Sequence, residues 1–359
     1  MKKRMNNLDL LRIISCYSII LLHVSSIWIN SYMGNGFFKL HKIDFYPVYL
    51  ESICRFAVPI FFMLTGALQL GYKSINNYKE FYKKSVIKIL IPTIFFSVLF
   101  LIYNLLLKFI LIQVSNGNYM QLFDVFKEFL KGYPYYHLWY LIVICFIYLL
   151  IPILYKFKKS IKYELYKKIC IVYFFLAIIS SITSEHTLSY DIGLICYYIG
   201  YVLIGDIIIT DSKTDNRKSI ILIMLSIIII SINAIIRFLV INNNILLKFS
   251  LVENFSPLIV ISSILLFLGF TKIRIRKDLS SFSNITLYIY IFHAVILDTI
   301  VRILVYFNIL NSKSSNLFIL LLFIVVSLLS IVISKIWINV KKNIYNNLKI
   351  EHFIDRIFI

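Results

Sequence analysis

Apolar runs of about 20 residues follow one another along the whole chain, with short polar stretches between them. A run of this length can cross the hydrocarbon core of a bilayer as an α-helix, which satisfies its own backbone groups. In the longest connection, residues 120–130 have apolar positions at helical spacing and predict an interfacial helix. The pattern predicts an all-α polytopic membrane protein, a single bundle of about ten transmembrane helices. We place these at residues 8–29, 46–71, 87–111, 138–155, 169–184, 190–209, 219–240, 255–271, 283–306 and 316–338.

Composition and charge agree with this picture. The chain is 60% hydrophobic and has 37 Lys and Arg against 17 Asp and Glu. If the N-terminus is cytoplasmic, 25 of those 37 cations fall on the cytoplasmic side, 6 in outer loops and 6 within the apolar segments. Cytoplasmic loops carry such an excess, so we expect both termini in the cytoplasm and the basic charge facing membrane lipid. Nucleic-acid binding is a poor explanation for this distribution.

The first apolar segment, "NLDLLRIISCYSIILLHVSS", contains Asp9, Arg12 and His23. Each ionisable residue near the bilayer centre costs about 2.5–3.5 kcal/mol on insertion scales. Arg12 and His23 are eleven residues apart, which places them on one helix face about 16 Å apart along the axis. Asp9 lies one turn before Arg12 and can pair with it. The face predicts the lining of a polar path; alternatively, Asp9–Arg12 is an interfacial ion pair and His23 a hydrogen-bonded core residue.

The second segment, "CRFAVPIFFMLTG", places Arg55 four residues before Pro59. Proline removes the helical hydrogen bond to the carbonyl of Arg55, which predicts a kinked, polar spot in the helix. A plain packing kink, with Arg55 reaching the outer interface, is the alternative. Three other cations lie near segment ends, where we expect their long side chains to reach the interface: Lys108, Arg237 and Lys335.

Two further histidines lie in similar settings. "YYHLWYL" puts His137 and Trp139 at the outer mouth of the fourth segment, although an aromatic interface belt also explains Trp139. "SNITLYIYIFHAVI" puts His293 in mid-segment with Tyr290 one turn before it, which suits proton movement or hydrogen bonding to an acceptor. The sequence has no P-loop, GxSxG, HExxH or CxxC motif, so we predict no metal site.

Five motifs in order resemble the membrane acyltransferase 3 family: D-L-L-R with R-x10-H, R-F-A-V-P-I-F-F-M-L-T-G, K-K-S-V-I-K-I-L-I-P, H-L-W-Y-L and L-Y-I-Y-I-F-H. The resemblance covers the whole chain. It implies an acyltransferase domain over residues 1–345 and a short cytoplasmic tail at 346–359. The family's Arg-x-x-Arg variant is not met, because Ser52 stands three residues before Arg55.

The resemblance implies an O-acetyltransferase in the plasma membrane of a bacterium, similar to stand-alone members proposed to modify enterobacterial common antigen or exopolysaccharide. It would move an acetyl or other short acyl group from cytoplasmic acyl-CoA to a hydroxyl of a cell-envelope glycan or lipid-linked sugar. The implied catalytic residues are His23, Arg12 and Arg55. For acyl-CoA we expect Asp9, Arg12, Lys83, Lys84 and Lys88, and for the acceptor His137, Trp139, Tyr290 and His293.

Two other functions fit the same residues. A transporter or exporter of a small molecule or lipid-linked glycan could use the polar path without any acyl-CoA. A scaffold within a glycan-assembly complex would need neither His23 nor Arg12. Dependence on acyl-CoA distinguishes the acyltransferase from both.

Overall fold

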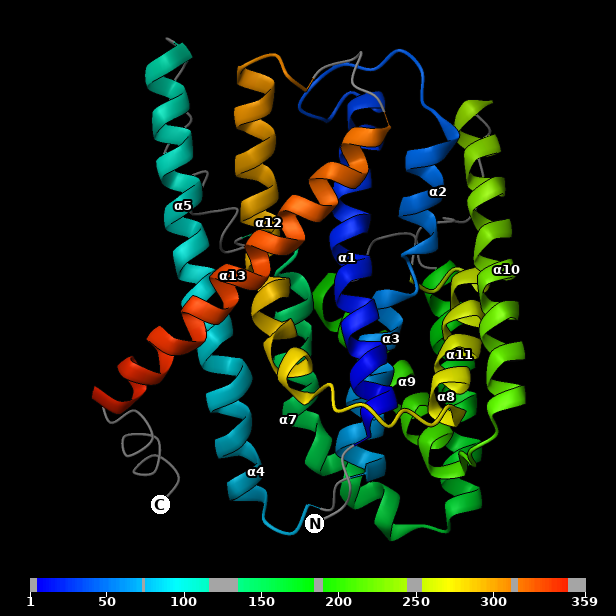
Figure 1. The fold of residues 1–359 in the computed structure, drawn as a ribbon. Coiled ribbons are helices and arrows are strands. Elements are labelled where there is room, and N and C mark those ends of the chain that lie inside the picture. The colour runs from blue at the N-terminus through cyan, green and yellow to red at the C-terminus, as the bar shows by residue number, and fades with distance from the viewer. Residues whose placement is uncertain are drawn as a thin grey trace. The chain divides into compact units, whose positions relative to one another are not determined.

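The structure is a computed structural model that describes residues 5–72, 75–115, 135–183, 190–243, 254–310 and 316–347. Every regular element in these ranges is a helix (Figure 1). The all-α prediction is therefore confirmed for the described residues. The predicted interfacial helix at 120–130 and the end of the predicted tail, 348–359, lie outside them.

All ten predicted segments contain helices, in this order: α1 (Asn6–Tyr32); α2 (Phe45–Ile53), α3 (Ala57–Gly66) and the π-helical η1 (Ala67–Tyr72); α4 (Tyr78–Ser85), η2 (Val86–Leu90) and α5 (Ile91–Ser115); α7 (Trp139–Ser160); α8 (Tyr163–Thr183); α9 (Tyr190–Asp211); α10 (Asn216–Asn242); α11 (Pro257–Lys272); α12 (Ser280–Tyr306); α13 (Leu317–Asn347). Among the described residues, seven helical stretches are long and apolar enough to cross a membrane. The protein is a multi-pass membrane protein. A count of ten crossings and cytoplasmic termini stay predictions.

The chain forms two compact units, one of residues 1–73 and 161–342 and one of residues 74–160 and 343–359. In the first unit α1 packs against α2, α3, α11 and α12, while α9 packs against α3 and α8. α10 packs against α2 and α11 on one side. Its other side carries large apolar side chains that are more than half exposed, including Ile220, Met224 and Ile228. Such a surface suits lipid rather than water.

Two glycines allow α3 and α9 to approach closely. A Cβ atom on Gly66 would lie 1.7 Å from the carbonyl oxygen of Val202, and one on Gly205 would lie 2.1 Å from that of Met63. Small residues at a helix–helix contact bring two backbones together, which is the common packing device inside membranes.

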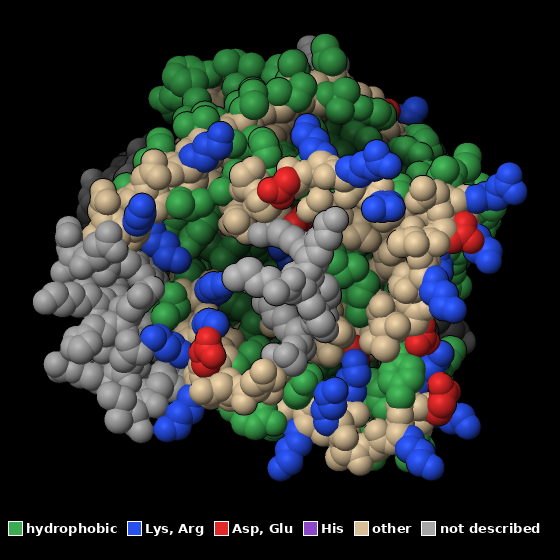
Figure 2. Space-filling view, turned by 60° about the horizontal axis from the view of Figure 1, so that its bottom comes forward, with side chains coloured by type: hydrophobic (Ala, Val, Ile, Leu, Met, Phe, Trp, Pro, Cys, Tyr) green, Lys and Arg blue, Asp and Glu red, His purple; other side chains and the backbone are tan. Residues whose placement is uncertain are grey.

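Three basic segments of the first unit meet at one end. The Asp215 amide donates to the carbonyl oxygen of Lys272 at 3.1 Å, and Asn6 Nδ2 donates to that of Ile275 at 3.4 Å. The start of α1, the start of α10 and the segment after α11 therefore lie together, as their shared assignment to the cytoplasmic side requires. Lys and Arg side chains are prominent on this face in Figure 2. Which side of the membrane it faces stays a prediction from charge.

The second unit contains α4, η2, α5 and α7. The rings of Phe81 and Tyr148 stack with centroids 6.1 Å apart, and the Tyr82 hydroxyl donates to the carbonyl oxygen of Leu149 at 3.0 Å. These contacts hold α4 against α7.

Candidate active site

α1 and α12 are joined at their N-terminal ends by a polar cluster. The hydroxyl of Ser283 donates to Asp9 Oδ1 at 2.5 Å and accepts a hydrogen bond from Arg12 Nη1 at 3.0 Å. The same guanidinium lies 3.6 Å from Asp9 Oδ1. Asp9 is buried, whereas 27% of the Arg12 side chain stays exposed. The predicted Asp9–Arg12 pair is confirmed, and a third residue that the pattern did not indicate fixes both side chains.

Further along the same seam, the imidazoles of His23 and His293 stack, with ring centroids 5.3 Å apart and 26° between planes. Between these two contacts the Cys16 thiol donates to the carbonyl oxygen of Thr286 at 3.5 Å. Residue numbers rise in the same direction on both helices, so α1 and α12 run parallel. Arg12 and His23 belong to one unbroken helix, so they keep the predicted separation of about 16 Å along the axis.

His293 is fixed by its own helix. Its Nδ1 lies 2.5 Å from the carbonyl oxygen of Tyr290, and because a carbonyl can only accept, Nδ1 carries the proton. The ring is fully buried, with the Tyr290 ring 5.6 Å away. Tyr290 in turn contacts Phe61 of α3 edge to face at 6.5 Å. His23 is only partly buried, so of the two imidazoles it is the more accessible.

Arg55 lies in a break between α2 and α3. α2 ends at Ile53 and α3 begins at Ala57. The amides of Arg55 and Ala57 donate to the carbonyl oxygens three residues earlier, at 3.1 Å each, which is the geometry of a tight turn. Pro59 cannot donate to the carbonyl four residues before it, so the helix lacks that hydrogen bond here, and the chain turns at this point. The predicted kink is a complete interruption.

The Arg55 side chain donates through Nη2 to Glu51 Oε1. Glu51 is 1% exposed, and its other oxygen accepts a hydrogen bond from Arg237 Nη1 of α10. Arg237 Nη1 also donates to the hydroxyl of Ser52 at 3.0 Å. The expectation that Arg237 reaches the interface is therefore wrong: its side chain is 9% exposed and points into the bundle. A buried carboxylate attracts it more strongly than the headgroup region does.

Arg55 is close enough to His23 for their charges to interact, because α1 packs on both α2 and α3. The structure thus brings together four of the predicted residues, His23, His293, Tyr290 and Arg55. Asp9 and Arg12 lie about three turns away along α1. The roles assigned to all of them stay predictions.

The remaining predicted residues belong to the second unit. Lys84 pairs with Glu80 one turn earlier, while Lys83 lies beside it on α4 and Lys88 is exposed on η2. Whether these lysines contact acyl-CoA stays a prediction.

His137 and Trp139 also lie in the second unit. His137 is 1% exposed and surrounded by the rings of Phe100, Tyr135 and Tyr136, at 5.4–5.9 Å. Trp139 meets Tyr140 edge to face at 6.4 Å. Aromatic rings thus lie against both residues, and acceptor binding by either stays a prediction.

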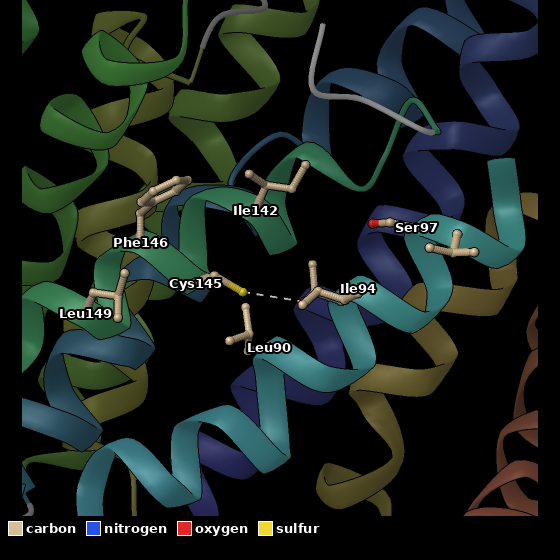
Figure 3. Close-up of a pocket in the computed structure, with 9 residues that line it drawn as sticks. Leu90, Ile94, Ser97, Ile142, Cys145, Phe146 and Leu149 are labelled. Carbon is tan, nitrogen blue, oxygen red and sulfur yellow. Dashed lines mark hydrogen bonds between the residues drawn. The ribbon is translucent and has the colours of Figure 1, made fainter. Parts of the chain in front are cut away.

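The second unit also has an apolar cavity of about 320 Å³ between α5 and α7 (Figure 3). Leu90, Ile94, Phe146 and Leu149 line it, together with the thiol of Cys145, which donates to the Thr93 hydroxyl at 3.6 Å. The lining contains no acid, base or cation. It suits hydrocarbon, and none of the predicted site residues lines it.

Three residues of the site were missed by the sequence patterns: Glu51, Arg237 and Ser283. A signal existed for Glu51, because a carboxylate inside a predicted membrane segment needs a cationic partner. No pattern could name that partner, since Arg237 is 186 residues away in the chain. Ser283 lies on α12, 271 residues after Arg12, and nothing in the sequence distinguishes it from the neighbouring Ser280 and Ser281.

Comparison with known proteins places this geometry in context. Residues 5–335 match the acyltransferase domain family. A 148-residue part is 31% identical to an amino-acid racemase from Enterococcus faecalis. That alignment covers 39% of this chain and only 18% of the racemase. No solved structure matches the chain. With a family match over nearly its whole length and a bundle of apolar helices, the chain belongs to the membrane acyltransferase 3 family.

Proposed function

We propose that this protein transfers an acetyl or other short acyl group from acyl-CoA to a hydroxyl of a cell-envelope glycan or lipid-linked sugar. The observation that carries the proposal is the pairing of His23 with the fixed imidazole of His293, within electrostatic range of Arg55. A base and a cation at one point of a membrane bundle are the two groups that acyl transfer to a hydroxyl needs.

In the proposed reaction His23 is the general base. It accepts the proton of the acceptor hydroxyl while that oxygen attacks the thioester carbonyl carbon. The new C–O bond forms, the C–S bond breaks, and the proton passes from His23 to the departing CoA thiolate. Arg55 stabilises the negative charge on the carbonyl oxygen during the transfer. His293 is completely buried, so we assign it the task of orienting His23.

Arg12 has a different place in the proposal. Part of its side chain stays exposed, and its position is fixed by Ser283 and Asp9. A guanidinium held in this way suits a phosphate of CoA as a two-pronged donor. An extended pantetheine arm is long enough for the distance of about 16 Å from there to His23. The expected setting is the plasma membrane of a bacterium, with acyl-CoA supplied from the cytoplasm.

The test uses membranes supplied with acetyl-labelled acetyl-CoA. Wild type, a deletion strain, His23→Ala and His41→Ala are compared at matched protein levels, and label is followed into glycan and lipid fractions. His41 is the matched control, since it is an exposed histidine outside the helices. We expect label with wild type and His41→Ala, and none with the other two. Equal label in all four contradicts acetyl transfer and favours transport, which flux of lipid-linked glycan would then measure.

A further inference from the structure

Glu51 is shared between two arginines that come from different parts of the first unit. Arg55 belongs to the turn after α2 and holds one carboxylate oxygen, and Arg237 belongs to α10 and holds the other. Glu51 is 1% exposed and the Arg237 side chain 9%, whereas the Arg55 side chain is 23% exposed. The half-open end of this cluster is therefore the Arg55 end, which lies near His23.

The charges in the cluster do not balance. One carboxylate and two guanidinium groups leave one net positive charge inside the bundle. Burying a charge is costly, and a neutral pair of Glu51 with either arginine would be enough to satisfy the carboxylate. The second arginine is thus more than neutralisation of the Glu51 charge requires.

The contact of Arg237 with Glu51 limits how Glu51 can bind Arg55. A carboxylate facing a single arginine can be held by two parallel hydrogen bonds, which use both oxygens and two of the five N–H donors of the guanidinium. Here Arg237 occupies Oε2, so Arg55 contacts Oε1 through Nη2. Arg237 also donates to Ser52, which anchors it on the far side of the carboxylate.

We propose that Arg237 is a positioning residue: by holding half of Glu51, it keeps the charge and the donors of Arg55 directed toward the His23 site. The inference rests on the proposed acyl transfer. Without Arg237, Glu51 turns both oxygens to Arg55 and neutralises it, although Arg55 itself is still present. Removing the carboxylate as well returns the net positive charge to Arg55.

This reasoning leads to a rescue experiment with Arg237→Met, Glu51→Gln, the double variant, Arg237→Lys and a control, Lys335→Met. Lys335 is an exposed cation within α13, so its loss tests only the removal of a charge from a membrane helix. We expect Arg237→Met to lower kcat of acyl transfer by about tenfold or more, with the acyl-CoA KM little changed. The double variant recovers most of that loss, and Arg237→Lys and Lys335→Met stay near wild type.

A second readout does not need activity. Phenylglyoxal modifies accessible guanidinium groups, and mass spectrometry reports modification of Arg55 separately. We expect Arg55 to react in wild type, to be protected in Arg237→Met, and to react again in the double variant. Failure of acyl transfer in wild-type protein would overturn the proposed function while this labelling still tests Arg237.

Two outcomes overturn the inference. One is a double variant no more active than Arg237→Met although both are folded by size-exclusion chromatography in detergent. The other is equal labelling of Arg55 in all variants. If Arg237→Met does not fold, Glu51→Gln carries the labelling comparison, with Arg237→Lys as its wild-type-like control. Arg55 labelling that is no higher in Glu51→Gln than in Arg237→Lys likewise contradicts the inference.

Discussion

His23 and His293 face each other across the seam of two parallel helices, with ring centroids 5.3 Å apart. Nδ1 of His293 is committed to the carbonyl oxygen of Tyr290, so the orientation of one ring is set by its own helix and that of the other by the stack. The two histidines therefore form one contact of the site, in which His293 is fully buried and His23 only partly buried.

Replacing His293 with phenylalanine separates stacking from hydrogen bonding. His293→Phe keeps an aromatic ring next to His23 but loses the hydrogen bond that fixes its orientation. We expect kcat of acyl transfer to fall by about tenfold or more, because a misplaced base loses most of its effect. The folded amount should match wild type, and the control His41→Phe should keep full activity. Unchanged kcat in His293→Phe would show that the stack alone orients His23.

Removing the hydroxyl of Ser283 disconnects Arg12 from α12. In Ser283→Ala, Asp9 loses a donor inside the bundle, which we expect to cost about 1–3 kcal/mol of stability. Arg12 also loses its anchor, so the KM for acyl-CoA should rise several-fold while kcat changes little. Ser281→Ala is the control, since Ser281 lies two residues before Ser283 and its side chain is exposed. Thermal unfolding in detergent and initial-rate kinetics measure the two effects, and a KM equal to that of Ser281→Ala would contradict a role of Arg12 in binding the donor.

Adding one methyl group between α3 and α9 should destabilise the bundle. In Gly66→Ala the new Cβ meets the Val202 carbonyl oxygen, which is backbone and cannot rotate away, so the helices must separate. Overpacking of this kind costs about 1–3 kcal/mol. Gly193→Ala is the matched control, because its nearest neighbour is a side-chain atom of Tyr197 at 3.8 Å. Equal unfolding temperatures for the two variants would show that α3 and α9 are not in close contact.

The first turn of α10 should loosen in acid. Asp215 caps this helix by accepting a hydrogen bond from the Lys218 amide at 3.1 Å, and this bond lowers the pKa of the carboxyl below its ordinary value of 3.8. A group with a lowered folded pKa stabilises the folded state above its ordinary pKa and loses that contribution as the pH falls through the folded pKa. The protection of the Lys218 amide, which is its exchange rate relative to the intrinsic rate at the same pH, should therefore fall as the pH drops below 3.8.

Asp215→Asn provides the control for this titration. Asparagine caps a helix about as well as aspartate but does not titrate in this range. We expect its Lys218 amide to show the same protection at neutral pH and no extra loss in acid. If wild type and Asp215→Asn lose protection together, the acid effect comes from another part of the molecule.

The sequence predicted the helices well and the site in part. Long apolar runs locate helices because the backbone N–H and C=O groups of a segment in lipid must bond to one another. A period of 3.6 residues places Arg12 and His23 on one face. Proline chemistry located the break at Arg55. The partners of Arg55 and Arg12 could not be predicted, since Glu51, Arg237 and Ser283 meet through tertiary packing alone. Arg237 is an example. Its place near a segment end predicts an interfacial side chain, but in the structure it donates a hydrogen bond to the buried carboxylate of Glu51.

The ion pairs also bear on how the chain is inserted during synthesis. Asp9 and Arg12 are three residues apart and Glu51 and Arg55 four, so each charge enters the membrane with a counter-charge from its own segment. Their distant partners follow much later, Arg237 after 186 residues and Ser283 after 271. The first two segments can thus be stable in the lipid before their distant partners are synthesised, because the charges within each segment are already paired. Completion of the site is then one of the last events in assembly, and a truncated nascent chain can be inserted without being active.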